Sequence, residues 1–332
     1  MANKIGTHSG TFHCDEVMAC MMLKKLPEFA ESPIIRTRDK AVLDTCSIVV
    51  DVGAEYDHSR RRYDHHQASF NLTMNSICSE LPFNKIKLSS AGLIFAHYGK
   101  QVIAETLDIE QDHPNMPIIF RKLYQSLIQE VDAIDNGVCI ADVKPNYVIN
   151  TDLASRVGRC NPGWNDTDQE EQPRFEKAMR MVELEFDQAV NFIFRSWLPA
   201  RSLVKEAYDK RFSSHPSGKL IIFSKDPPIW KDHLLEIESI DKDSVSKPIF
   251  CIYPRKDNSW SCQAVPASQQ LKFQSRLDLP QPWRGYRDQE LDKLIGIEGC
   301  VMVHASGFLG IHKNYDGALH MATTALKLSN LI

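Results

Sequence analysis

Side chains that bind metal ions recur in the first 135 residues, where strands or helices are expected to end. They are His8, His13, Asp15, Asp51, Asp64, His65, His66 and either Asp132 or Asp135. Carboxylate and imidazole ligands without thiolates suit Mn²⁺ best, and Mg²⁺ or Zn²⁺ less well. The ligands are too many for one tetrahedral ion, so the pattern predicts two divalent ions that share a bridging carboxylate. Such a pair promotes in-line attack on phosphorus.

The densest part of this pattern runs from Asp51 to His66. It follows residues 47–50, a short β-branched run that is typical of a buried strand. Open α/β sheets bind ligands at the carboxyl ends of their strands, which is where Asp51 falls. Burying Asp64, His65 and His66 without partners would cost several kcal/mol, and a divalent metal would satisfy them. We therefore expect Asp64, His65 and His66 to take part in catalysis.

Each of these residues also has an ordinary structural explanation. An aspartate after a strand is commonly a helix cap or a turn residue, and Asp132 and Asp135 could cap a helix end. The pair His65–His66 would lie on the surface of most proteins. Cys14 is not predicted to be a nucleophile, because no base with an orienting group is visible for it. The joint occurrence of these residues is what favours a metal site.

Apolar periodicity places the same residues at the ends of regular elements. In the first fifty residues or so, strands are expected over 4–7, 33–37 and 47–52, with helices over 16–26 and 39–46 between them. Strands that alternate with helices predict a parallel sheet with crossover helices.

Longer helices follow. One opens at Ser89 or Ser90 and is expected to stop at Gly99, and a second covers 117–134 and ends at Asn136–Gly137. A third covers 172–211 with a break near Pro199. Residues 67–87 and 138–170 are expected to be loop-rich.

Strand signals dominate after the turn-rich segment 215–218. Strands are expected over 219–223, 248–253, 260–265 and 300–304, with a final helix over 316–328. The second and third of these flank residues 255–258, which suit a hairpin loop. We therefore predict a first domain over 1–212, including a long helical connector, and a second, smaller α/β domain over 216–332.

The composition is that of a globular protein. The net charge is −4, so any polyanion must bind to a local basic patch. Nine cysteines occur singly, which favours a reducing compartment over a disulfide framework. No apolar run approaches the roughly 20 residues that span a membrane. We expect a cytoplasmic or nuclear protein with no membrane association and no obligate protein partner; a mitochondrial location is the alternative, although no presequence is evident.

The metal-binding motifs resemble those of the DHH phosphoesterase superfamily. Their sequences are similar to those of one branch, the Myg (melanocyte proliferating gene) exonuclease family, and the similarity extends over nearly the whole chain. The matching segments are residues 6–16, 63–66, 88–93, 131–137, 196–201, 273–276, 282–285 and 303–308.

This resemblance implies a divalent-metal-dependent 3′–5′ RNA exonuclease. It implies a DHH-type parallel-sheet domain and a smaller α/β domain, with the active site in the cleft between them. The resemblance assigns residues to four metal motifs. The first motif corresponds to His8, His13 and Asp15, and the second to Asp51. The third corresponds to residues 64–66, with Asp64 as the bridging carboxylate, and the fourth to Asp132 or Asp135. The superfamily usually has two aspartates before the first helix, whereas this chain has His13 and Asp15, which could change the metal preference.

The second domain offers residues suited to gripping a substrate. Residues 303–312 read as a strand, a Gly-rich loop and a helix, in which backbone N–H groups could approach a phosphate. The candidate substrate-binding residues are Arg276, Trp283, Arg284, His304, Ser306, Gly307 and His312. Cations beside a stacking surface are what single-stranded nucleic acid requires. The alternatives are a core role for Trp283 and a solvated face for the arginines.

Two other functions remain open. One is a small-molecule phosphohydrolase acting on pyrophosphate, cyclic dinucleotides or short oligonucleotides. The other is a non-enzymatic, metal-stabilised RNA-binding module. The cationic and aromatic residues of the second domain favour a polymer, so we predict hydrolysis of single-stranded RNA by two divalent ions, most favourably Mn²⁺.

Overall fold

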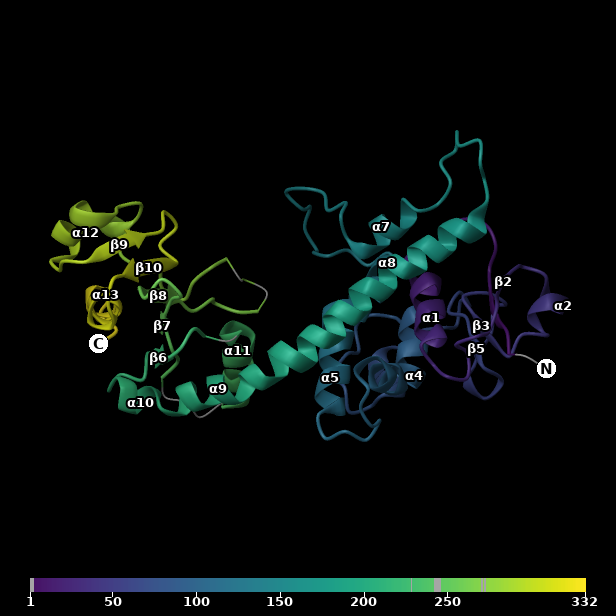
Figure 1. Ribbon diagram of the computed structural model, residues 1–332, viewed down its shortest axis with the longest axis horizontal. Helices are drawn as coiled ribbons and strands as arrows, with labels where there is room; N and C mark the ends of the chain where they lie inside the picture. Colours follow the sequence, from purple (N-terminus) through teal and green to yellow (C-terminus); the bar gives the residue numbers. More distant parts are fainter. Residues whose placement is uncertain (1–2, 228, 242–245, 270, 272) are drawn as a thin grey trace. The chain divides into compact units, whose positions relative to one another are not determined.

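The computed structural model describes residues 3–227, 229–241, 246–269, 271 and 273–332, and the chain forms two compact units, Met1–Phe194 and Arg195–Ile332 (Figure 1). Each unit combines a sheet with helices, which confirms the predicted α/β class. The units divide at residue 194, whereas the sequence predicts a boundary between 212 and 216. The reason for the difference is that Val204 and Tyr208 pack in a core with Ile221 and Cys251 of the second unit.

The sheet of the first unit has the strand order β2-β1-β3-β5-β4. Its strands are β1 (Ile5–Thr7), β2 (Ile34–Arg36), β3 (Ile48–Val50), β4 (Tyr56–Asp57) and β5 (Arg62–Tyr63). The strands β2, β1, β3 and β5 run parallel, and β4 pairs antiparallel with β5. Ile5 pairs with both Ile34 and Ile48 at the centre of the sheet. The predicted parallel sheet is therefore confirmed.

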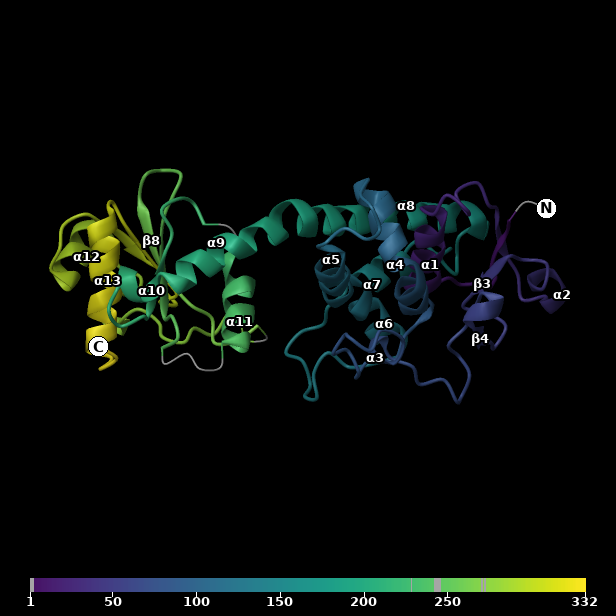
Figure 2. The same cartoon turned by 90° about the horizontal axis from the view of Figure 1, so that it is seen from below.

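Helices pack against this sheet and against one another. They are α1 (Cys14–Lys24), α2 (Lys40–Leu43), α3 (Met74–Ile77), α4 (Ser90–Leu107), α5 (Met116–Leu123), α6 (Gln129–Asp135), α7 (Leu153–Gly158) and α8 (Glu171–Phe192), with a 3₁₀ turn η1 (His58–Arg60). The central helix is α1, which is buried along nearly its whole length and contacts α4, α8, α6 and α7 (Figures 1 and 2). Its first turn is therefore held firmly beside the strand ends.

The helix expected to stop at Gly99 continues to Leu107, so that prediction is wrong. Gly99 is a packing residue. A Cβ atom there would lie 2.8 Å from Phe120 Cε2 and 2.8 Å from Phe95 Cδ2. The missing side chain lets α4 approach α5 closely, which offsets the low helix propensity of glycine.

The predicted helix over 117–134 is confirmed, with one irregularity. A π-helical segment, η2 (Tyr124–Ile128), joins α5 to α6. Short π-helical segments inside helices are frequent at functional sites. Here the segment directly precedes α6, which carries Asp132 and Asp135 near its end.

The long helix expected over 172–211 is also interrupted. A second π-helical segment, η3 (Ile193–Trp197), follows α8 and precedes α9 (Leu198–Asp209). Pro199 lies in the first turn of α9, where its missing N–H group is tolerated. The irregularity predicted near Pro199 is therefore present just before that residue.

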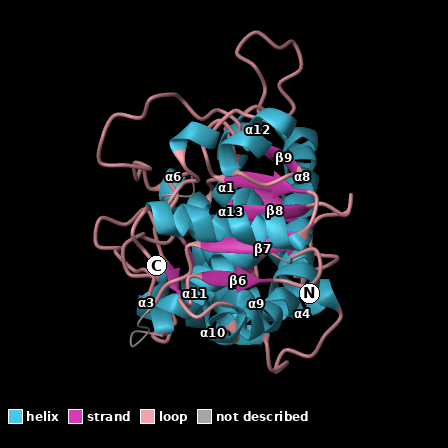
Figure 3. Cartoon of the chain, turned by 90° about the vertical axis from the view of Figure 1, so that its left-hand side faces the viewer, coloured by secondary structure: helices cyan, strands magenta, loops and turns pink. Residues whose placement is uncertain are grey.

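The second unit has a five-stranded sheet of order β6-β7-β8-β10-β9. Its elements are α10 (Arg211–Ser214), β6 (Leu220–Ile222), α11 (Trp230–Ile240), β7 (Phe250–Pro254), β8 (Trp260–Ala264), the 3₁₀ turn η4 (Gln281–Trp283), α12 (Asp288–Ile295), β9 (Cys300–Val303), β10 (Leu309–His312) and α13 (Tyr315–Leu328). Figure 3 shows β6, β7 and β8 edge to edge, and β10 pairs with both β8 and β9. The antiparallel pairing of β7 with β8 confirms the predicted hairpin around residues 255–258.

This unit has two core clusters, one of side chains from its sheet with α9 and α11 and one of side chains from its sheet with α12 and α13. Phe250, Leu291, Met321 and Leu326 are fully buried in the second of these clusters. In the part of the chain that the structure describes, we find no helix both long and apolar enough to cross a membrane.

Candidate metal centre

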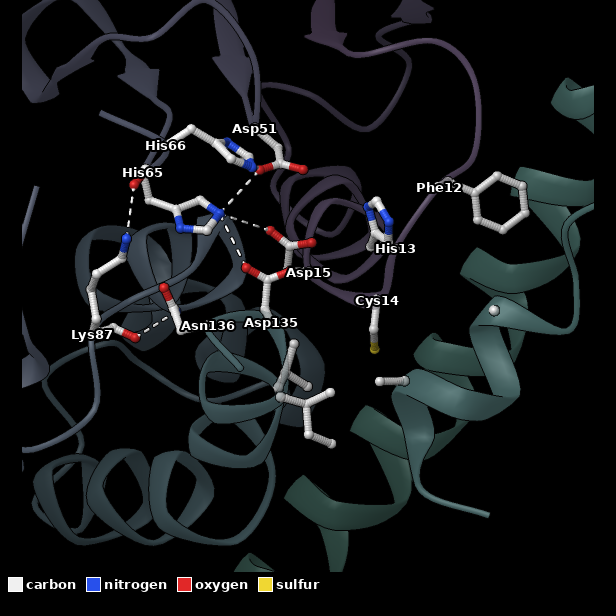
Figure 4. Close-up of a pocket in the computed structure, with 14 residues that line it drawn as sticks. Phe12, His13, Cys14, Asp15, Asp51, His65, His66, Lys87, Asp135 and Asn136 are labelled. Carbon is white, nitrogen blue, oxygen red and sulfur yellow. Dashed lines mark hydrogen bonds and ion pairs between the residues drawn. The ribbon is translucent and has the colours of Figure 1, made fainter. Parts of the chain in front are cut away.

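The strand ends of the first unit bring the predicted metal-binding side chains to one edge of its sheet. His8 follows β1, Asp51 follows β3 and His65 lies two residues after β5, and these parallel strands end at the same edge. Asp15 comes from the first turn of α1 and Asp135 from the end of α6. Figure 4 shows Asp15, Asp51, His65 and Asp135 pointing toward one another.

Four side chains form a first group of possible ligands. They are His8, His13, Glu16 and Asp51, each of which offers an atom within 4.8 Å of the others. His8 Nε2 lies 3.0 Å from Glu16 Oε1 and 3.4 Å from Asp51 Oδ2. Glu16 also accepts a hydrogen bond of 2.9 Å from the backbone N–H of His13. Glu16 therefore ties the two histidines of this group together.

A second group surrounds His65 and combines two overlapping sets of possible ligands, one of Asp15, His65 and Asp135 and one of Asp51, His65 and His66. The Nε2 atom of His65 lies 3.2 Å from Asp135 Oδ2, 3.3 Å from Asp51 Oδ1 and 3.7 Å from Asp15 Oδ2. The hydroxyl of Ser90, at the start of α4, donates a hydrogen bond of 2.7 Å to Asp15 and fixes that carboxylate. Three carboxylates thus converge on one imidazole.

Asp51 faces both groups, with Oδ2 toward His8 and Oδ1 toward His65. Its backbone φ is 58°, in the left-handed region that is uncommon for residues other than glycine. Such conformations tend to occur at functional sites, where the surrounding structure maintains them. Asp51 is therefore the carboxylate that the two groups share, which is the place expected from the sequence for a bridging carboxylate.

The sequence assigned that bridging position to Asp64, and the geometry does not support it. Asp64 Oδ2 accepts the backbone N–H of Ala54 at 2.6 Å, and Oδ1 accepts the N–H of His66 at 3.1 Å and lies 2.7 Å from His66 Nδ1. Both oxygens are thus engaged within the loop. Asp64 orients His66, whose side chain is 61% exposed and contacts Asp51 Oδ1 at 3.6 Å.

Of the two aspartates left open by the sequence, Asp135 joins the cluster and Asp132 does not. Asp132 is fully buried and accepts hydrogen bonds from the Ser89 N–H, the Ser89 hydroxyl and the Tyr124 hydroxyl, at 2.9, 2.7 and 3.0 Å. It also lies so close to Gly92 that a Cβ atom there would be 2.3 Å from its Oδ1. Asp132 therefore connects α6 to the start of α4.

Burial and crowding shift the pKa values of the cluster. Burial by itself would lower the pKa of His8, but its contacts with Asp51 and Glu16 raise it to about 10. Burial raises the pKa of Glu16 to about 8. Burial and the nearby charge of Asp15 raise the pKa of Asp135 above its usual range. Despite its burial, contacts with His65 and His8 lower the pKa of Asp51 to about 2. The charge of Asp15 thus opposes that of Asp135, and a bound cation would relieve this repulsion.

The buried polar atoms of the cluster fit a divalent cation. Asp15 Oδ1, Asp51 Oδ1 and both ring nitrogens of His65 are buried and form no hydrogen bond among the described residues, and Asp51 Oδ1 and His65 Nε2 have only the ion-pair contacts given above. An unpaired buried polar group typically costs roughly 1–3 kcal/mol, which coordination would offset. Carboxylate oxygens and imidazole nitrogens are ligands that Mn²⁺ accepts. The ligand set is therefore compatible with the divalent metal that the sequence predicts.

The two groups border a cavity of about 490 Å³. Among the described residues that line it, Lys87 is the only lysine or arginine. Lys87 Nζ donates a hydrogen bond of 3.2 Å to the backbone oxygen of His65, and Asn136 donates one of 2.9 Å to the backbone oxygen of Lys87 (Figure 4). The cavity thus combines acidic ligands with one fixed cation.

Glu16, Lys87 and Asn136 belong to this site although the sequence patterns did not identify them. Glu16 directly follows Asp15, and its place in the first motif was the available signal. Asn136 reads only as part of a helix C-cap signal in the sequence. Lys87 precedes the matching segment 88–93, and nothing in the local sequence distinguishes it from a surface lysine.

Two predicted substrate-binding residues of the second unit are structural instead. Arg276 Nη1 donates hydrogen bonds of 2.8 Å to Glu238 Oε1 and 2.7 Å to the Pro248 backbone oxygen. Trp283 is only 4% exposed and packs in the core, so a base cannot stack on its ring. The predicted roles of Arg276 and Trp283 at the substrate are therefore corrected.

The segment 303–312 is a hairpin between β9 and β10, not the predicted strand, loop and helix. The Ser306 N–H donates to His304 Nδ1 at 3.2 Å, and the Gly307 N–H donates to the His304 backbone oxygen at 2.8 Å. Gly307 has a φ of 80°, so the turn requires glycine. These backbone donors close the turn, which corrects their predicted role as a phosphate cradle.

His312 is also structural. It is 1% exposed, and its Nε2 pairs with the Glu298 backbone oxygen at 3.0 Å. Arg284 is partly exposed and donates to the Leu279 backbone oxygen at 2.9 Å. Of the predicted substrate-binding set, His304, Ser306 and Arg284 therefore keep surface that a ligand can reach.

Known proteins resemble this chain over almost its full length. A family described as "Uncharacterised protein family (UPF0160)" matches residues 4–326. The chain is 47% identical to the MYG1 exonuclease of Homo sapiens over 327 residues, which cover 97% of this chain and 85% of that protein. It is 42% identical to a MYG1 protein of Caenorhabditis elegans over 331 residues, which cover 99% and 96%.

Among solved structures, RecJ in complex with Mn²⁺ from Thermus thermophilus is 12% identical, with a TM-score of 0.25. The match covers 98% of this chain and 52% of that one, and the TM-score is too low to carry an argument. The sequence matches are much stronger, and they run from β1 into α13 and include every residue of the two ligand groups. This chain is therefore a member of the MYG1 family.

Proposed function

We propose that this protein is a divalent-metal-dependent 3′–5′ exoribonuclease that hydrolyses the phosphodiester bonds of single-stranded RNA. The observation that carries the proposal is the pair of ligand groups on either side of Asp51. Relatives named MYG1 exonuclease support the exonuclease activity. The resemblance of the motifs to the Myg exonuclease family supports RNA as the substrate and the 3′–5′ direction.

Two metal ions, most favourably Mn²⁺, would be held by residues of the first unit. One would be held by His8, His13 and Asp51, and the other by Asp15, Asp51, His65 and Asp135. When bound, the ions supply Lewis acidity that stabilises negative charge on the phosphoryl oxygens.

Other residues of the chain would orient the phosphodiester and supply a proton to the leaving oxygen. Lys87 offers a positive charge to a non-bridging phosphate oxygen at the cavity wall. His66 is held at Nδ1 by Asp64, so its other ring nitrogen can hold a proton for the leaving oxygen. Glu16 keeps His8 in place through their 3.0 Å contact.

The test is a time course on single-stranded RNA labelled at either end, with Mn²⁺, Mg²⁺ or a chelator. We expect metal-dependent shortening from the 3′ end. Asp51→Asn should lower the rate by more than about a hundredfold, since even residues that only orient metal ligands are worth 10- to 100-fold. The matched control is Asp39→Asn, which changes an exposed N-cap of α2 to another good cap and should leave the rate unchanged.

The other results would each overturn part of the proposal. Shortening from the 5′ end would reverse the polarity, and cleavage of DNA in preference to RNA would change the substrate. If RNA is bound but not cleaved, the protein is a binding module. If RNA is ignored while pyrophosphate or a cyclic dinucleotide is hydrolysed, it is a small-molecule phosphohydrolase.

A further inference from the structure

The cavity beside the ligand groups has an apolar wall that the proposed hydrolysis does not use. Val131 and Ile134 of α6, Ala154 and Gly158 of α7, and Cys14 of α1 line it. The helices α6 and α7 contact each other in the first unit (Figure 2). The residues that α7 contributes to the cavity are only these two small ones, among the residues that the structure describes.

This wall is continuous with the ligand groups. On α6, Val131 and Ile134 precede Asp135, whose carboxylate faces His65. On α1, Cys14 precedes Asp15, and Figure 4 shows its sulfur pointing away from the Asp15 carboxylate. A phosphate held at the ligand groups would therefore have an apolar surface beside it within the same cavity.

Size and chemistry limit what this surface can bind. The cavity of about 490 Å³ falls within the range of roughly 300–1,000 Å³ that is typical of small-ligand sites. The wall offers carbon and sulfur surface, which favours burial of the face of a flat, weakly polar ring and offers few hydrogen bonds to the edges of that ring. Ile134 is 42% exposed, so the wall is open at its rim and would be covered by a ligand.

We infer that the wall between α6 and α7 holds the nucleobase of the terminal nucleotide, while the adjoining phosphodiester lies at the ligand groups. This inference rests on the proposed function and adds to it a subsite for one base. Because the wall has no matched donors and acceptors, the subsite accepts all four bases.

Gly158 allows this subsite to be filled without disturbing the fold. It is the last residue of α7, lines the cavity, and has no positive φ. A Cβ atom added there would meet nothing within 4 Å. Gly158→Leu therefore adds a large side chain at the cavity wall from a Cβ position that is free of contacts, and Gly158→Ala adds only that Cβ atom.

The experiment measures kcat and KM of the full-length protein with Mn²⁺ on two RNA substrates. One has an ordinary 3′-terminal nucleotide, and the other lacks the base of that nucleotide. Covering apolar surface is worth roughly 25 cal/mol per Å², so a base that covers about 60 Å² of this wall would bind about tenfold more tightly. We expect the wild type to show a KM about tenfold higher on the abasic substrate. Gly158→Leu should raise KM for the ordinary substrate by a similar factor and hardly change it for the abasic one. Gly158→Ala, with its smaller side chain, should give a smaller change of the same kind, whereas Asp39→Asn, which does not line the cavity, should resemble the wild type.

The outcomes separate this inference from the proposed function. If the wild type cleaves both substrates equally well, or if Gly158→Leu slows both by the same factor, the base subsite is wrong while the exonuclease stands. A strong preference for one of the four terminal bases would also overturn an apolar subsite. If neither substrate is cleaved by the wild type, the proposed function fails and this inference fails with it.

Discussion

Asp132 and Asp135 lie three residues apart and serve different purposes. Asp132 accepts hydrogen bonds from Ser89 and Tyr124, and burial raises its pKa to about 7. Asp135 faces His65 and lines the cavity. The backbone of α6 turns the two carboxylates to different neighbours, so replacing each by asparagine should have different effects.

For Asp135→Asn we expect a loss of metal-dependent activity of more than about a hundredfold, with no loss of stability in a chelator. The substitution removes one charge from a crowded group of carboxylates. For Asp132→Asn we expect activity per folded molecule to be retained and stability to fall. An amide has one acceptor oxygen for three donors, so unfolding should become easier by roughly 1–3 kcal/mol. Urea unfolding in a chelator and activity per folded molecule measure both effects. Equal loss of activity in the two variants would contradict these assignments.

At the scale of the helix, replacing glycine by alanine should have opposite effects on stability at two positions. Gly99 lies inside α4 against Phe95 and Phe120, with no room for a Cβ atom. Gly158 ends α7 beside open space. Both glycines carry the backbone entropy cost that alanine avoids, so packing decides the sign of a change to alanine.

Gly99→Ala should destabilise the protein by roughly 1–2 kcal/mol, because overpacking costs more than the gain in helix propensity. Gly158→Ala should leave stability unchanged or raise it by up to roughly 1 kcal/mol. Urea unfolding of the two variants in parallel measures both values. A stabilising Gly99→Ala would show that α4 and α5 can separate without cost.

The sequence predicted the elements better than the directions of their side chains. The apolar runs before His8 and Asp51 identified β1 and β3, and parallel strands then required their ends to meet. The choice between Asp51 and Asp64 as the shared ligand depended on a backbone φ of 58° and on two hydrogen bonds within a loop, which no pattern of residue types encodes. Likewise, the burial of Trp283 depends on contacts distant in sequence.

At the scale of the whole molecule, every residue of the two ligand groups belongs to the first unit. The second unit has its own sheet and core, formed by side chains such as Phe250 and Met321. A metal that binds only the folded form stabilises what it binds, by roughly 2.7 kcal/mol at a hundred times its dissociation constant. A bound metal should therefore stabilise the first unit more than the second.

Hydrogen exchange of the full-length protein, with Mn²⁺ or with a chelator, measures this directly. We expect Mn²⁺ to slow exchange in β1, β3 and α1, because their residues flank the ligands, and to leave β7 and β8 unchanged. In Asp51→Asn the difference should largely disappear, since both groups lose their shared carboxylate. Equal slowing in both sheets would mean that the two units unfold as one. No slowing in either sheet, at Mn²⁺ concentrations that support activity, would exclude the cluster around Asp51 as the metal centre.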